Sequence, residues 1–149
     1  MKLSRIMAAV DGSKSSERAA KVAMDVAKTM GASLFLLEVI QHPAITKAGP
    51  GARAAEADVV QYMELAKSDA EEFIGRLEAA AKASTVRVRG EVEENVPSVV
   101  QAIVEYADEW EVDLIVVGTR GLTGFKKILL GSVSGGVVAH APCSVLVVR

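Results

Sequence analysis

The residues whose types and spacing most clearly indicate a chemical role lie in a glycine-containing segment near the carboxyl end of the chain. Gly118 and Gly121 follow an apolar run, and Gly131 precedes a predicted helix over residues 132–140. Glycine permits positive φ angles and the close approach of a ligand to the backbone. The first amides of a helix lack partners within it and lie at the positive end of the helix dipole, so they can bind phosphate. The spacing fits a phosphate site and equally a surface loop with ordinary glycine turns.

Hydroxyl and cationic side chains occur in the same segment. Ser132 and Ser134 are expected to bring hydroxyl donors to the helix start, and Arg120, Lys126 and Lys127 supply positive charge. The segment matches neither the P-loop nor the dinucleotide-binding fingerprint, because no Lys follows the glycine at the helix start and the glycine spacing differs. A phosphate site here would therefore be built mainly from backbone amides.

Asp11 is a second candidate, because it ends an apolar run and is followed by Gly12 and Ser13. A carboxylate at the carboxyl end of a strand could accept hydrogen bonds from ribose hydroxyls or base N–H groups, or hold a metal ion. It could equally be a turn residue ahead of a helix. The residues alone leave both interpretations open.

Short apolar runs predict the strands that position these residues. Four of them are nearly continuous in Val, Ile and Leu, which is typical of strands buried on both faces of a parallel sheet; they cover residues 6–10, 34–40, 113–117 and 144–148. Residues 86–92 instead alternate between apolar and charged side chains. That alternation indicates a half-exposed strand at a sheet edge.

Apolar residues at helical spacing fill the intervals between the strands. Four helices are predicted. The first ends near Met30, the second covers about 54–83, the third begins at Pro97 and the fourth covers 132–140. Ser13 or Ser15 can cap the first helix and Gly31 can end it, while Pro97 suits the first position of the third helix. The order is therefore strand and helix in alternation, which predicts an α/β fold with right-handed crossovers.

Two segments without periodicity follow strands, at residues 41–53 and 119–130. The second is far longer than the usual loop between a strand and a helix. Open α/β sheets bind their ligands at the carboxyl ends of strands, so these segments are expected to border a binding site.

Composition narrows the class of protein. The chain has 149 residues, so a single domain over residues 1–149 is expected. With 17 Lys and Arg against 19 Asp and Glu, and with no basic block, it is not expected to bind nucleic acid or a membrane surface. Cys143 is the single cysteine, which excludes an intramolecular disulfide and a cysteine zinc cluster. We therefore expect a cytoplasmic protein.

The spacing Gly118-x2-Gly121-x9-Gly131-Ser132 resembles the ATP-binding motif of the universal stress protein family. The resemblance extends to Asp11-Gly-Ser after the first strand, to Pro97, and to the final segment over residues 141–149. It implies an open five-stranded parallel sheet in the order 3-2-1-4-5 with helices on both faces. Such a fold is Rossmann-like, of the kind found in adenine nucleotide alpha hydrolases.

The resemblance also implies a set of site residues. Asp11 and Gly118 would face each other across the crevice at which the strand order reverses, and the backbone of Val39 would meet the adenine edge. The residues implied to line the ribose and triphosphate are Gly118, Gly121, Gly131, Ser132 and Val133, with Ser134 close by. Any Mg²⁺ would be carried by the phosphates, and neither catalytic residues nor protein metal ligands are expected.

Members of the family commonly pair through the last strand, here residues 144–148, so a homodimer is implied. One departure lies nearby: Gly135 and Gly136 interrupt the last helix, at a cost of up to about 1 kcal/mol each relative to Ala. This looser helix is expected to soften the phosphate site without abolishing binding.

Three functional hypotheses follow. The first is a non-catalytic ATP-binding module for stress-response signalling, which acts as a dimer on an unidentified protein partner. The second is a slow ATP hydrolase or phosphotransferase, which would need a group that positions water near the γ-phosphate. The third is a dimeric interaction protein without nucleotide. Because Asp11 is the single acid that can be placed in the crevice, we expect a binding protein with at most weak ATPase activity.

Overall fold

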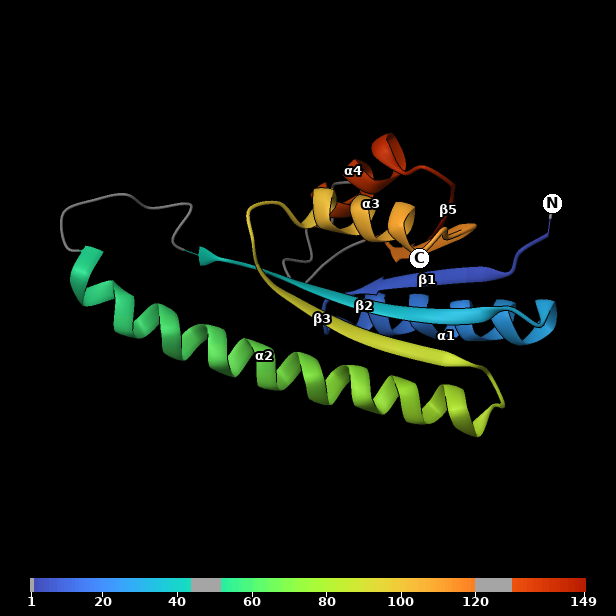
Figure 1. The fold of residues 1–149 in the computed structure, drawn as a ribbon, viewed down its shortest axis with the longest axis horizontal. Coiled ribbons are helices and arrows are strands. Elements are labelled where there is room, and N and C mark those ends of the chain that lie inside the picture. Colours follow the sequence, from blue (N-terminus) through green and yellow to red (C-terminus); the bar gives the residue numbers. More distant parts are fainter. Residues whose placement is uncertain (1, 44–51, 120–129) are drawn as a thin grey trace.

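Strands and helices alternate along the whole chain in the computed structural model, which describes residues 2–43, 52–119 and 130–149 (Figure 1). The strands are β1 (Arg5–Val10), β2 (Ser33–Gln41), β3 (Val88–Val96), β4 (Leu114–Gly118) and β5 (Ser144–Val148). The helices are α1 (Lys14–Met30), α2 (Ala52–Ala83), α3 (Val99–Glu109) and α4 (Ser132–His140). In the described part of the chain, no helix is both long and apolar enough to span a membrane.

The strands form one parallel sheet in the order β3-β2-β1-β4-β5, which confirms the predicted topology. From β1 the chain moves outward to β2 and β3, then returns to the other side of β1 for β4 and β5. The register places Val10 beside Glu38 and Ala8 beside Val116. The strand order therefore reverses between β1 and β4, which is where a crevice opens in such sheets.

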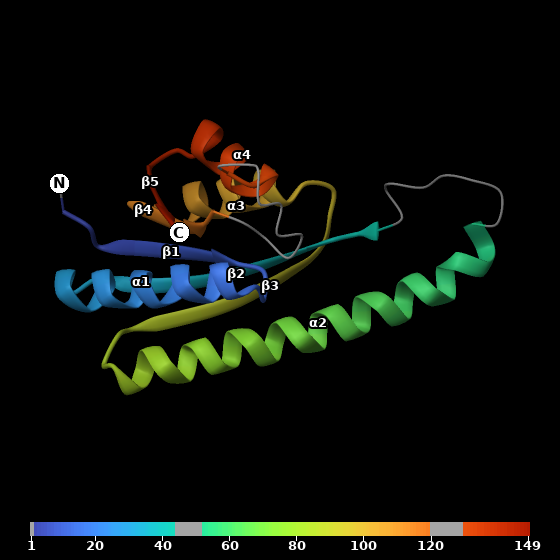
Figure 2. The ribbon, with the colours of Figure 1, turned by 180° about the vertical axis from the view of Figure 1, so that it is seen from behind.

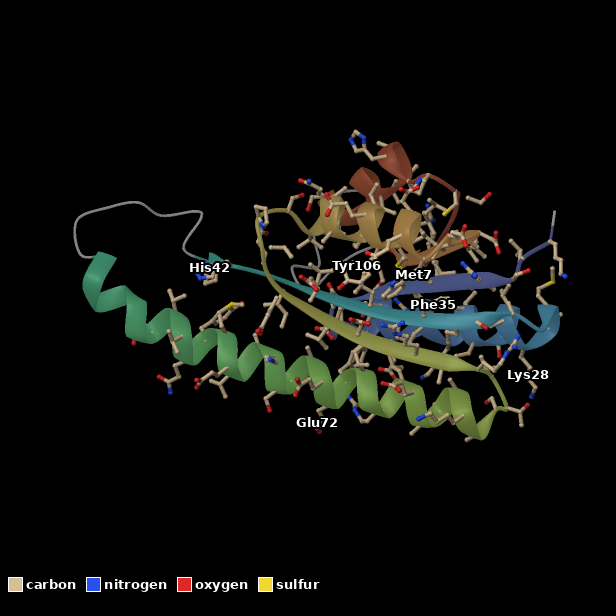
Figure 3. All side chains as sticks on the ribbon, in the orientation of Figure 1. Met7, Lys28, Phe35, His42, Glu72 and Tyr106 are labelled. Atoms are coloured by element: carbon tan, nitrogen blue, oxygen red, sulfur yellow. The ribbon has the colours of Figure 1, made fainter. Side chains whose placement is uncertain are left out.

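Helices cover both faces of the sheet, α1 and α2 on one side and α3 and α4 on the other (Figures 1 and 2). The alternation of side chains along each strand divides the core accordingly. Ile6, Leu34 and Leu36 pack toward α1 and α2. Met7 and Ile115 pack in the cluster that contains residues of α3, and Figure 3 places Met7 between the sheet and α3.

Helix α1 begins and ends where its capping residues predict. Ser13 has an extended backbone, and its hydroxyl accepts a hydrogen bond from the amide of Ser16 at 3.1 Å. Gly31 adopts the left-handed conformation at φ 67° and closes the last turn through carbonyls of Ala27 and Lys28. Glycine, which lacks a Cβ, enters that conformation without strain. Both predicted caps are thus confirmed, with Ser13 rather than Ser15 at the start.

The start of α3 differs from the prediction. Ser98 is the N-cap, and its hydroxyl accepts a hydrogen bond from the amide of Gln101 at 3.2 Å. Pro97 therefore precedes the cap and is not the first helical residue, so its predicted position was wrong. The reason is that the serine hydroxyl satisfies one of the orphaned amides of the first turn, a contact that favours Ser98 as the cap.

The two edge strands behave differently from each other. β3 is an edge strand, as its alternating pattern predicts, although it runs over Val88–Val96 and is thus shifted toward the carboxyl end. β5, which we expected to be buried on both faces, has exposed side chains at Ser144 and Leu146 and half-buried ones between them. Ser144 and Leu146 share the face of their register partners Leu114 and Val116, on the side of α1, so α4 on the opposite face does not cover them and the expectation was wrong for β5.

Candidate functional site

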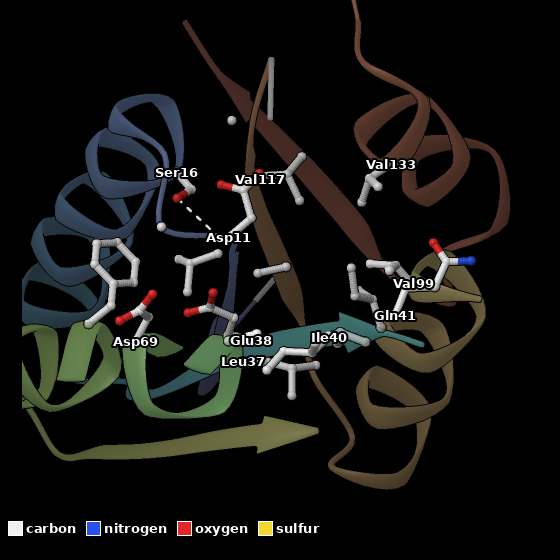
Figure 4. A pocket seen from close by; sticks show the side chains of 18 of the residues that line it. Asp11, Ser16, Leu37, Glu38, Ile40, Gln41, Asp69, Val99, Val117 and Val133 are labelled. Carbon is white, nitrogen blue, oxygen red and sulfur yellow. Dashed lines mark hydrogen bonds between the residues drawn. The ribbon is translucent and has the colours of Figure 1, made fainter. Parts of the chain in front are cut away.

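A cleft of about 1020 Å³ opens at the carboxyl ends of β1, β2 and β4 (Figure 4). Its lining includes the residues that follow β1, the last residues of β2 and β4, and the first turn of α4. Residues of α2 and α3 close its sides. The cleft therefore lies at the reversal of strand order, the place at which the topology predicts a ligand site.

Asp11 is a turn residue that also lines the cleft. Its Oδ1 accepts a hydrogen bond from the amide of Ser13 at 3.0 Å, which makes it a turn residue ahead of α1. Its own amide donates to the hydroxyl of Ser16 at 3.2 Å, the bond drawn in Figure 4. Gly12, at φ 80°, completes the turn. The Asp11 side chain is half-buried and lines the cleft, so the turn holds a carboxylate at the site.

The first turn of α4 opens on the same cleft. Gly131 is its N-cap, and no side chain caps the helix start. The amide of Gly131 donates to the carbonyl of Thr119 at 2.7 Å, which ties the helix start to the end of β4. Ser132 and Val133 are exposed and line the cleft. An uncapped helix start at a cleft places amide donors and positive dipole charge where an anion can reach them.

The hydroxyl of Ser134 has a different role from the one expected. It lies within 3.3 Å of the carbonyl of Thr119 and 3.2 Å of the carbonyl of Gly131, and it can donate to either. The side chain is buried, at 5% exposure. Because its hydroxyl hydrogen is used inside the protein, Ser134 fastens α4 to β4, and its hydroxyl is not an open donor for a ligand.

Gly118 and Gly131 line the cleft as predicted, but neither uses positive φ. Gly131 has φ −65°, and within the described residues the glycines at positive φ are Gly12 and Gly31. A Cβ atom on Gly118 would lie 2.4 Å from the hydroxyl oxygen of Ser15. Gly118 is therefore required by the close approach of β4 to α1, a reason that is independent of any ligand.

Apolar side chains form the wall of the cleft on the side of α3 and α4. Val39 is half-buried near the end of β2 and packs with the cluster beneath α3. The other apolar residues of this wall are Leu37, Val99, Ile103, Val117 and Val133. A surface of this kind beside polar backbone groups suits a planar ring that carries hydrogen-bonding edges.

Glu38, which the sequence analysis did not single out, is the most perturbed acid of the cleft. Its side chain is 9% exposed, and its Oε2 accepts no hydrogen bond from the described residues. Burial, followed by the negative charges of Asp11 and Asp69, raises the pKa of Glu38 to about 7. The signal in the sequence was one acid inside an otherwise apolar strand, Leu36-Leu37-Glu38-Val39-Ile40.

A sequence model described as the universal stress protein family matches residues 2–149. The chain belongs to this family. A universal stress protein of Methanocaldococcus jannaschii is 35% identical over 145 residues, which cover 97% of this chain and 81% of that protein.

Solved universal stress proteins have the same fold. The protein UspA from Lactobacillus plantarum superposes with a TM-score of 0.88 at 26% identity, over 100% of this chain and 99% of that one. A universal stress protein crystallised in complex with cAMP superposes with a TM-score of 0.72, also at 26% identity, over 100% and 99% of the two chains.

Of the site residues that the family resemblance implies, all that the structure describes line the cleft. Asp11, Val39 and Gly118 line the cleft, together with the first turn of α4, Gly131 to Ser134. Gly121 and the cations Arg120, Lys126 and Lys127 lie outside the described residues. Among the residues that are described, no group of His, Cys, Asp or Glu has the arrangement of a metal site.

Proposed function

We propose that this chain binds an adenine nucleotide, ATP, in the cleft, with the phosphates at the first turn of α4. One observation carries the proposal: the uncapped start of α4 opens on the same cleft that the Asp11 carboxylate lines. The helix start offers donors and positive potential to an anion, and the carboxylate offers acceptors to hydroxyl or amino groups. A nucleotide carries both kinds of group at opposite ends.

The roles within the site follow from the chemistry of each wall. The amides of Ser132 and Val133, with the hydroxyl of Ser132, face the phosphates. The carboxylate of Asp11 accepts hydrogen bonds from the ribose, and the backbone of Val39 meets the edge of the base against the apolar wall. Mg²⁺ arrives with the phosphates rather than on protein ligands. The complex of a similar universal stress protein with cAMP supports an adenine nucleotide as the ligand class.

The proposed signalling role depends on the nucleotide and on pairing of two chains. β5 is an edge strand whose Leu146 is 37% exposed, and an unpaired apolar edge favours association. Head-to-head pairing of β5 gives a two-fold interface. We therefore propose a cytoplasmic homodimer in which bound nucleotide changes the populated conformation, and with it the affinity for a protein partner.

Calorimetric titration of nucleotide-free protein with Mg·ATP tests the site. We expect saturable binding of about one ATP per chain for a pre-formed single cleft. Gly131→Val should abolish binding, because its side chain blocks the approach of phosphate to the first-turn amides. The matched control is Gly135→Ala on the same helix, where an added Cβ meets only the Leu130 side chain at 4.0 Å. Equal ATP affinity in the Gly131→Val variant would contradict the phosphate placement.

A further inference from the structure

Glu38 occupies a core-facing position of β2, where an apolar side chain is the usual occupant. Alternation along β2 directs it to the same face as Leu34 and Leu36, which are fully buried in the core toward α1 and α2. Its neighbours in register are Val10 of β1 and Val92 of β3, both apolar. A buried carboxyl group with an unpartnered oxygen costs free energy unless something supplies a hydrogen bond. The position thus requires an explanation that packing does not provide.

The charged groups around Glu38 are acids on two different elements. Figure 4 shows Glu38 next to Asp69 of α2, with Asp11, which follows β1, above them in the view. Two further charged residues of α2 line the cleft, Glu72 and Arg76, and both are exposed at its rim. Among the described residues, none of the ion pairs in the structure includes Glu38, Asp11 or Asp69.

This acidic part of the cleft lies away from the proposed phosphate site. In the view of Figure 4, Asp11 lies between Val133 of α4 and Asp69 of α2, with Glu38 next to Asp69. A nucleotide whose phosphates contact α4 would therefore extend its nucleoside toward Asp11 and Glu38. A carboxylate accepts hydrogen bonds and donates none, so it fits the part of a ligand that carries N–H or O–H groups.

We propose that Glu38 accepts a hydrogen bond from the nucleoside of the bound nucleotide, from a ribose hydroxyl or the amino group of the base, and loses its proton when the ligand binds. This inference rests on the proposed nucleotide-binding function and assigns the nucleoside-recognition role to a residue outside the glycine motif. Glu38 lines the cleft, so a ligand bound there can bring a hydrogen-bond donor to its carboxyl group. The proton leaves to solvent, and the negative charge on Glu38 is then stabilised by the donated hydrogen bond.

The proposal predicts a specific pH dependence of binding. Without ligand, the pKa of Glu38 is about 7 because of burial and the nearby charges of Asp11 and Asp69. A hydrogen bond donated to the carboxylate lowers this pKa in the complex, so binding releases a proton below pH 7. Affinity should therefore rise as pH approaches about 7 and level off above it. Each unit by which the ligand lowers the pKa raises the affinity about tenfold across this range.

The test is calorimetric titration of the parent protein and of Glu38→Gln with Mg·ATP. The titrations run from about pH 5.5 to about pH 8, a range that brackets the raised pKa of Glu38. Glutamine keeps the shape and one acceptor oxygen but has no proton to lose. Titration of the ATP phosphates is common to both proteins, so the difference between the two profiles belongs to Glu38. We expect the parent to gain affinity relative to Glu38→Gln as pH rises, and to release protons when measured in buffers of different ionisation enthalpy.

A second variant checks the electrostatic cause. Asp69→Asn removes one of the two charges that raise the pKa of Glu38. The rise in ATP affinity should then occur at lower pH than in the parent. A profile that stays in place in Asp69→Asn contradicts the contribution of Asp69 to the pKa of Glu38, and a profile that is identical in the parent and Glu38→Gln overturns the inference. So does an affinity that falls above pH 7 in the parent alone, since Glu38 would then act as a donor.

Modified nucleotides identify the donor on the ligand. If 2′,3′-dideoxy-ATP shows the same profile in the parent and in Glu38→Gln, a ribose hydroxyl is the donor. If inosine triphosphate does so, the amino group of adenine is the donor. A difference between the two proteins that survives with both ligands overturns the assignment to the nucleoside. Absence of ATP binding at every pH would overturn the proposed function itself, an outcome distinct from binding with unchanged pH dependence.

Discussion

Gly118 at the end of β4 lies against Ser15 in the first turn of α1. A Cβ on Gly118 would stand 2.4 Å from the Oγ of Ser15 and 2.9 Å from its backbone carbonyl carbon. The two residues are far apart in the sequence, and their contact sets how closely β4 approaches the start of α1. Because Asp11 is held by the turn that begins α1, the contact also sets the distance between Asp11 and the β4 wall of the cleft.

Gly118→Ala should therefore destabilise the protein by about 1–3 kcal/mol, the range for overpacking at a tight contact. Backbone atoms of Ser15 contribute to the clash, so shortening the Ser15 side chain should not restore the loss. Chemical denaturation measures the effect. Gly75→Ala is the matched control, because no atom lies within 4 Å of the added Cβ and alanine is the better helix former. Equal stability of the two variants would contradict the contact.

The two glycines of α4 should respond in opposite ways to alanine. A Cβ on Gly136 would lie 2.7 Å from a methyl group of Val100 on α3, whereas one on Gly135 meets only the Leu130 side chain at 4.0 Å. Gly136→Ala should thus destabilise the protein by about 1–3 kcal/mol, and Gly135→Ala should stabilise it by up to about 1 kcal/mol. Thermal unfolding of both variants is the measurement. Stabilisation by both changes would mean that α3 and α4 do not pack at Gly136.

Glu38 should make the ligand-free protein less stable as pH rises. Its pKa is about 7 in the folded chain and near its ordinary value of 4.5 in the unfolded chain. The folded state therefore binds more protons between these values, and the free energy of unfolding decreases as pH rises from about 4.5 to about 7. The loss amounts to about 3 kcal/mol and is complete above pH 7.

Glu38→Gln should lack this loss, because it carries no titrating group. It is expected to match the parent near pH 4.5, the ordinary carboxyl value, and to exceed it in stability above pH 7. Urea denaturation of both proteins at several pH values measures the difference. Parallel stability curves would mean that Glu38 titrates normally in the folded protein.

A charge on the exposed edge strand should separate the proposed dimer. Leu146→Lys on β5 should give monomers in light scattering at concentrations where the parent is dimeric, because burying a lysine in the interface is costly. Val60→Lys on α2 is the control, since Val60 is also an exposed apolar residue but lies on a helix away from β5. A parent protein that is monomeric, or a Leu146→Lys variant that remains dimeric, would rule out pairing through β5.

Local patterns were sufficient to predict the elements and several of their ends. Near-continuous apolar runs located the central strands, and Ser13 and Gly31 located the ends of α1, because each cap acts within one turn of the chain. The start of α3 was misplaced, since Pro97 and Ser98 are adjacent and either suits a helix start. The sequence also predicted that a helix starts at Gly131 and Ser132, because that start depends on neighbouring residues alone.

The sequence by itself thus determined the order of strands and helices, the family and the glycine-bearing start of α4. The tertiary structure decided what surrounds each residue. It buried Glu38 beside Asp11 and Asp69, turned the hydroxyl of Ser134 inward, and set Gly118 against Ser15. The physical reason is the sequence separation of the residues that interact. A helix cap or an apolar periodicity depends on neighbours within a few residues. Burial, the electrostatic field of nearby charges and close packing depend on residues that only the folded sheet brings together.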